Sequence, residues 1–188
     1  MGNSFYFMPI IQDFIYSITS YFEESNKFLL VKKHLMKLAT LLYIKNQKGE
    51  YLLMERLKDP NKGLMSPPGG KLKTEDPETP AECAAREAYE ECKIISKPDD
   101  WELTGIISEK NFPGMGNIML FLMEYKLSLD ILPEKCNEGE FFFIHPENFL
   151  NYDLPVTDKL FLWEKILNRN GEMIMMKLDC SNYPDVVY

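Results

Sequence analysis

Three glutamates, Glu87, Glu90 and Glu91, crowd one short stretch of the chain. In a helix, spacings of three and four residues place their carboxylates on one face about one turn apart. Like charges at this spacing repel each other, so a cation should offset them. A hard divalent cation such as Mg2+ prefers carboxylate oxygens and completes its shell with water and phosphate oxygens. For the three glutamates taken alone, the alternative is a solvated acidic helix face.

The helix that would carry these carboxylates has clear signals before it. Thr79, Pro80 and Glu82 form a capping box with proline at the first helical position, so the helix should begin at about Pro80. Upstream, the run Pro67-Pro68-Gly69-Gly70 predicts an extended approach and a glycine loop that lets a phosphate or metal come close. Small residues at helical spacing predict close packing against another element: Ala81, Ala84, Ala85, Ala88 and Cys92.

Taken together, these residues resemble the Nudix hydrolase signature, G-x5-E-x7-R-E-U-x-E-E-x-G-U, where U is aliphatic. The matching positions are Gly70, Glu78, Arg86, Glu87, Ala88, Glu90, Glu91 and Ile94. The sequence departs from the signature twice. Residues 74–77 carry a two-residue insertion, and Lys93 stands where the family has glycine. Neither departure removes a carboxylate.

The resemblance implies hydrolysis of a phosphoric anhydride with Mg2+, or Mn2+ in its place. It implies that Glu90, Glu91 and the Gly70 carbonyl bind the metal and that Glu87 is either a ligand or the general base. Arg86 would orient the carboxylates by pairing with Glu78. Gly69 would support the loop.

Residues outside the signature are candidates for the substrate. Glu134 and Glu138 follow the central strands and could supply an assisting carboxylate, the alternative being a solvated loop. Arg56, Phe112 and Asp158 could face a nucleotide, through aromatic stacking and a carboxylate that reads a purine edge. The layout looks like the branch that converts oxidised purine nucleoside triphosphates, such as 8-oxo-dGTP, to monophosphates.

The order of predicted elements indicates an α/β fold with a mixed sheet covered on both faces. This is similar to the α/β/α sandwich of the Nudix fold, and the resemblance covers residues 37–178. We expect strands at 37–44, 50–56, 101–108, 117–127, 141–144 and 172–178, a second helix at 157–167, and an irregular tail at 179–188.

Residues 1–36 form an N-terminal extension outside the resemblance. Phe7, Ile11, Phe14 and Ile18 recur at helical spacing, which predicts an amphipathic helix that begins after Pro9. Its apolar face would pack on the domain or on a second subunit, which favours a homodimer. Its polar side lacks the Lys and Arg of a membrane-surface helix, so we expect no membrane partner.

Composition narrows the functional classes further. With 188 residues, 45% hydrophobic and 27% charged, the chain has the balance of a soluble domain. A net charge of -8 and the lack of a basic stripe argue against binding a nucleic acid polymer. The four cysteines lack disulfide or zinc spacing, which predicts free thiols and a cytoplasmic protein.

Three functional classes therefore stay open at this point. The first is a metal-dependent nucleotide pyrophosphohydrolase, and the second is a non-catalytic nucleotide-sensing module with the same fold. The third is a structural protein whose acidic helix is merely solvated. Among substrates, ADP-ribose or another nucleotide sugar is the alternative to a purine nucleoside triphosphate.

Overall fold

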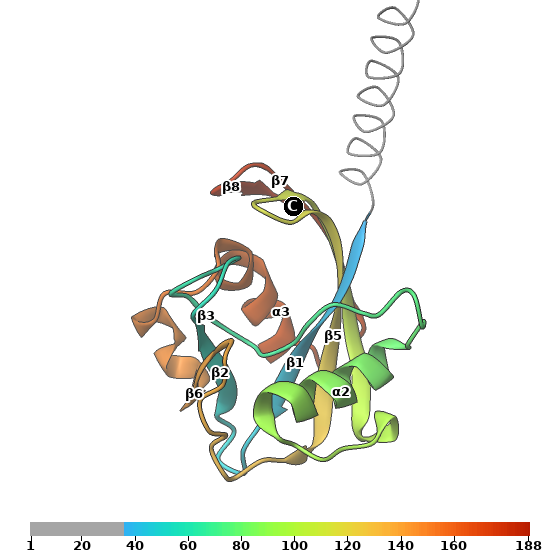
Figure 1. The fold of residues 1–188 in the computed structure, drawn as a ribbon. Helices are drawn as coiled ribbons and strands as arrows, with labels where there is room; N and C mark the ends of the chain where they lie inside the picture. The colour runs from blue at the N-terminus through green and yellow to red at the C-terminus, as the bar shows by residue number, and fades with distance from the viewer. Residues whose placement is uncertain (1–35) are drawn as a thin grey trace, which may run out of the picture. The chain divides into compact units, whose positions relative to one another are not determined.

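A mixed β-sheet forms the centre of this computed structural model, which describes residues 36–188 (Figure 1). Strand order is β3-β2-β1-β5-β4-β7-β8, and β6 pairs with β2. The strands are β1 (Lys37–Lys45), β2 (Tyr51–Arg56), β3 (Met65–Ser66), β4 (Trp101–Phe112), β5 (Gly116–Ser128), β6 (Gly139–Ile144), β7 (Ile174–Asn182) and β8 (Asp185–Val187). β1 runs parallel to β5 and β4 runs parallel to β7, whereas the other pairs are antiparallel. The predicted N-terminal helix lies outside the described residues.

Helices cover the sheet on both faces. The helix α2 (Pro80–Cys92) buries Ala84 and Ala88 against one face, in a cluster that includes Leu42 of β1. A C-terminal helical segment, the π-helical η3 (Asp158–Leu162) followed by α3 (Trp163–Leu167), buries Leu162 and Trp163 in the cluster on the other face. Short 3-10 helices lie at η1 (Pro98–Asp100) and η2 (Pro146–Asn151). The predicted α/β/α sandwich with a mixed sheet is confirmed.

The edge of β1 holds the glycine loop in place. β1 pairs with β2 only near the hairpin, at Lys45 and Tyr51. Further along β1, the backbone N–H of Thr40 donates to the carbonyl of Gly70 at 2.8 Å, and that of Leu42 donates to the carbonyl of Pro68 at 2.8 Å. Backbone pairing with β1 therefore fixes the loop directly before α2.

The main departure from the predicted elements is at the C-terminus. The prediction of an irregular tail over residues 179–188 was wrong. β7 continues to Asn182, and β8 returns antiparallel to it. The reason is a period of two: Met176, Leu178 and Cys180 all bury their side chains on the same core face. β4 also runs to Phe112 instead of ending at Ser108.

Within residues 36–188, no helix combines the length and the apolar character needed to cross a bilayer.

Candidate active site

Helix α2 begins and ends at defined residues, which fixes the direction of its carboxylates. Thr79 Oγ1 accepts a hydrogen bond from the Glu82 backbone N–H at 3.2 Å, and the Glu82 carboxylate accepts from the Thr79 backbone N–H at 2.8 Å. This is the predicted capping box. At the other end Lys93 adopts a left-handed conformation, with φ of 58°. The helix thus exits as it would with glycine, at a cost of roughly 1–2 kcal/mol.

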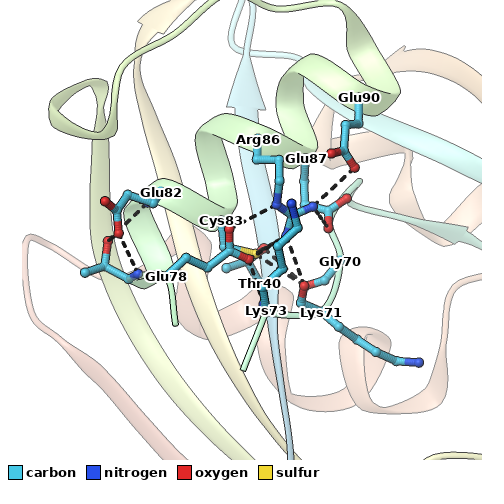
Figure 2. A network of polar contacts seen from close by, with 11 residues as sticks. Thr40, Gly70, Lys71, Lys73, Glu78, Glu82, Cys83, Arg86, Glu87 and Glu90 are labelled. Carbon is cyan, nitrogen blue, oxygen red and sulfur yellow. Dashed lines mark hydrogen bonds and ion pairs between the residues drawn. The ribbon is translucent and has the colours of Figure 1, made fainter. Parts of the chain in front are cut away.

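The guanidinium of Arg86 lies at the centre of a carboxylate network (Figure 2). Its Nε and Nη2 donate to the two oxygens of Glu78 at 3.0 and 2.6 Å, so the predicted pair is present. Nη1 donates to Glu87 at 2.7 Å and to Glu90 at 3.2 Å. Nη2 also donates to the carbonyl of Lys71 at 3.1 Å, which ties the helix to the glycine loop. Arg86 therefore sets where three carboxylates point.

The two-residue insertion leaves this network intact. Residues 74–77 form a turn outside the sheet. Glu78, which follows that turn, accepts a hydrogen bond from the Lys73 backbone N–H at 2.8 Å. The Arg86 hydrogen bonds are the main cause that lowers the pKa of Glu78 to about 2. Glu78 is thus an ionised partner that holds Arg86 in place, and the insertion at residues 74–77 does not displace it.

Two of the signature carboxylates are buried. Glu87 is 9% exposed and Glu91 is 8% exposed. Burial raises the pKa of Glu91 to about 7. The hydrogen bond that Glu91 accepts from the Gly69 backbone N–H at 3.0 Å opposes this shift. Burial also raises the pKa of Glu87, while Arg86 opposes that shift. Buried carboxylates are costly to ionise without a cation, so this face of α2 suits a positively charged ligand.

Gly70 lies directly beneath the Glu87 carboxylate. A Cβ at position 70 would stand 2.2 Å from Glu87 Oε1, so Glu87 occupies the space that any other residue would fill. The Gly70 carbonyl accepts from the Thr40 backbone N–H in the pairing with β1. A carbonyl oxygen has two lone pairs, and the metal predicted here would bind the second, beside long contacts from Thr40 Oγ1 at 3.5 Å and Cys83 Sγ at 3.8 Å.

The donor set fits a hard divalent cation in the type of its ligand atoms. Three carboxylates and a backbone carbonyl are all oxygen ligands, as Mg2+ and Mn2+ require. Among residues 36–188, no three acidic, histidine or cysteine side chains yet converge as a metal cluster. The reason is that Glu87 and Glu90 both turn toward Arg86. The ligand roles of Glu87, Glu90, Glu91 and Gly70 stay predictions.

One pocket of about 1030 Å³ joins the carboxylate helix to the substrate candidates, which is ample space for a nucleotide. Its lining includes the following sequence candidates: Arg56, Gly69, Gly70, Glu87, Glu90, Glu91, Phe112, Glu134, Glu138 and Asp158. Glu78 and Arg86 support the pocket from outside its lining. Residues far apart in the sequence thus meet in one place, although their individual roles stay predictions.

Two of these lining residues, Arg56 and Glu138, lie next to each other. Arg56 Nη2 stands 3.9 Å from Glu138, and Arg56 Nε donates to the carbonyl of Pro60 at 3.0 Å. Lys58 Nζ lies 2.7 Å from Glu138. Glu138 is therefore held by two cations, whereas the alternative for this residue was a freely solvated loop.

Glu109 is a pocket residue that sequence reasoning missed. It is 3% exposed and lines the same pocket as Asp158. Burial raises its pKa to about 7, with Asp158 as the next cause. The expected strand ended at Ser108, which left Glu109 in a loop. The signal that could have found it is the alternation of Ile107 and Glu109, which places both on one face of a longer strand.

Comparison with known proteins gives a consistent result. A family model described as the NUDIX domain matches residues 35–162. The MutT protein from Bacillus halodurans is 22% identical with a TM-score of 0.61, covering 77% of this chain and 90% of its own. The MutT protein from Methanosarcina mazei Go1 is 22% identical with a TM-score of 0.61, covering 72% and 95%. The NUDIX domain of Shewanella oneidensis NrtR, solved with ADP ribose, is 18% identical with a TM-score of 0.57, covering 72% and 87%.

Proposed function

Because the chain belongs to the Nudix family of pyrophosphohydrolases, we propose that it hydrolyses a purine nucleoside triphosphate to the monophosphate and pyrophosphate. The observation that carries this proposal is the single pocket that Glu87, Glu90 and Glu91 share with Phe112 and Asp158. A triphosphate at the carboxylates and a base at the other residues would fill both parts of that pocket. Oxidised purines such as 8-oxo-dGTP fall within this substrate class.

A divalent cation, Mg2+ or Mn2+, supplies Lewis acidity and neutralises phosphate charge when bound. Glu90, Glu91 and the Gly70 carbonyl would hold it. Glu87, the ligand or general base of the family signature, would take a proton from the attacking water, and burial raises the pKa of its carboxyl. Arg86 keeps Glu87 in position through the contact at 2.7 Å. The predicted assisting carboxylates, Glu134 and Glu138, line the same pocket.

Two alternatives remain open to the same test. ADP-ribose is a second substrate class, favoured by the ADP ribose bound to the NUDIX domain of NrtR. A non-catalytic sensing module is disfavoured by the complete carboxylate set of the signature, in register on α2. Free thiols at all four cysteines support a cytoplasmic location. A homodimer stays a prediction that rests on residues 1–36.

The test is product analysis with purified full-length protein, Mg2+ and a panel of 8-oxo-dGTP, dGTP, ADP-ribose and dinucleoside polyphosphates. Glu90→Gln and Glu91→Gln should lower kcat/KM by far more than tenfold, which is a loss above ~1.4 kcal/mol. Glu147→Gln is the matched control, because its side chain is 86% exposed and lies outside the pocket lining. Retention of more than a tenth of the wild-type activity in Glu91→Gln would refute the mechanism. Nucleotide binding without turnover would favour the sensing module.

A further inference from the structure

Glu109 carries a buried polar atom with no partner. Within residues 36–188, only two buried side-chain polar atoms lack a hydrogen bond, Glu109 Oε1 and Trp163 Nε1. Of these two residues, Glu109 lines the pocket and Trp163 does not. A buried acceptor without a donor is costly unless a ligand satisfies it. The unpartnered oxygen therefore indicates a ligand group that donates hydrogen bonds.

The neighbours of Glu109 in the pocket supply a second carboxyl, the Thr157 hydroxyl and apolar contact. Asp158 is 6% exposed, and its Oδ1 accepts from the hydroxyl of Thr157 at 3.3 Å. Phe112 and Ile118 of the adjoining strands contribute apolar wall to the same pocket. This end of the pocket thus combines two carboxyl groups with the flat apolar surface that an aromatic base would contact.

We propose that Glu109 and Asp158 recognise the base of the substrate and select a guanine-type edge, in which two adjacent N–H groups face the carboxyl oxygens. The proposal rests on the proposed function for the phosphate end of the pocket. Guanine presents a ring N–H and an exocyclic amino group side by side, so it can donate to both carboxyl groups of the pair. Adenine presents a ring nitrogen acceptor at the corresponding position, so it would place a lone pair against the carboxyl oxygens.

The electrostatics of the two carboxyls support a donor-rich ligand. Burial raises the pKa of Asp158 to about 7, and burial together with Asp158 raises the pKa of Glu109 to about 7. Tyr43 and Cys180 also lie close to this pair. Neither residue carries a positive charge. Hydrogen bonds with the Thr157 hydroxyl lower the pKa of both carboxyls, but Glu109 Oε1 keeps no partner and is open to a donor from the ligand. A base with two N–H groups meets that need, whereas a base with a single N–H meets half of it.

The experiment measures binding of GMP, IMP and AMP to full-length protein by isothermal titration calorimetry. IMP keeps the ring N–H of GMP but lacks the exocyclic amino group. We expect GMP to bind at least tenfold more tightly than AMP, and IMP to bind about tenfold more weakly than GMP. In Glu109→Gln and in Asp158→Asn, the preference for GMP over AMP should fall below threefold. Glu102→Gln, an exposed site on the same strand β4, should keep the preference.

The proposal is overturned if wild-type protein binds GMP and IMP within threefold of each other, a comparison that needs no variant. It is also overturned if Glu109→Gln and Asp158→Asn, folded by circular dichroism, both retain the tenfold preference. A purely structural role for the pair would lower affinity for every base alike and leave the ratio unchanged. Turnover of GTP and ATP at equal rates would keep the proposed hydrolysis and refute the base selection. A GMP preference without any turnover would keep the base selection and refute the proposed hydrolysis.

Discussion

Replacing Gly70 with alanine should separate activity from folding. The new Cβ would stand 2.2 Å from Glu87 Oε1, whereas ordinary contact begins at 3.4 Å. The backbone at Gly70 cannot retreat easily, because its carbonyl pairs with Thr40 of β1 at 2.8 Å. The carboxylate of Glu87 must therefore move by about 1.2 Å and give up its 2.7 Å contact with Arg86.

The size of each effect follows from which atoms move. A misplacement of about 1 Å in a reacting group can cost roughly 100-fold in kcat, or ~2.7 kcal/mol. Stability should change less, because the displaced group is the end of a flexible side chain and Arg86 keeps both bonds to Glu78. Alanine also restricts the unfolded chain, which offsets about 0.4–1 kcal/mol of any loss. We expect a fall in unfolding free energy of no more than about 2 kcal/mol.

The neighbouring glycine gives the matched control. At Gly69 the φ angle is +146°, and a Cβ would stand 2.2 Å from the backbone oxygen of Thr40, which cannot swing aside. Gly69→Ala should therefore lower stability by about 3 kcal/mol, or about 6–12 °C in Tm. Steady-state kinetics and thermal melts on both variants test the reasoning. If Gly70→Ala keeps kcat within threefold of wild type, the position of Glu87 over Gly70 does not matter for the reaction.

Three further predictions use the same assays. Arg86→Lys keeps the charge but loses the two-point contact with Glu78. We expect kcat to fall about tenfold and Tm to fall by about 2–8 °C. A variant with the wild-type kcat would contradict this reasoning. Lys93→Gly removes a non-glycine residue from a left-handed conformation. We expect Tm to rise by about 2–4 °C and activity to stay within threefold of wild type. An unchanged Tm would count against backbone strain at residue 93. The native state holds the Glu109 proton longer than the unfolded state, because the pKa rises from 4.5 to about 7, so stability falls as pH rises through that window. The Tm difference between Glu109→Gln and wild type should thus grow in favour of the variant from pH 5 to pH 8, and a constant difference would contradict it.

The carboxylate helix could be predicted because its signals are local. The cap at Thr79 and the spacing of Glu87, Glu90 and Glu91 all lie within fifteen residues, and helix periodicity converts such spacing directly into a shared face. The pairing of Arg86 with Glu78 came from the family signature, and the structure contains it. Sequence reasoning is strongest where one element carries the whole pattern.

In the part of the pocket lined by Phe112 and Asp158, Glu109 was missed because its burial depends on strands that are distant in the sequence. Whether Glu109 is buried depends on how far β4 extends, and β4 extends because it pairs with β7, where Glu109 lies opposite Leu178. That partner stands about seventy residues later, so the local signal was limited to the alternation of Ile107 and Glu109. The wrong prediction of an irregular tail has a different cause. Pairing with β4 ends at Asp179, and beyond it β7 pairs with β8 in a short local hairpin.

The two ends of the pocket solve one electrostatic problem in different ways. At the phosphate end, the single positive charge of Arg86 contacts three carboxylates, and Glu91 has only the Gly69 N–H as a hydrogen-bond donor. That end carries negative charge in excess, which a divalent cation and its phosphates would balance. At the proposed base end, none of the cations in residues 36–188 shifts the pKa of Glu109 or Asp158, and a neutral base would offer N–H dipoles. Under the proposed function, the first end would bind the charged phosphates through a cation, and the second would distinguish bases by their hydrogen-bond donors.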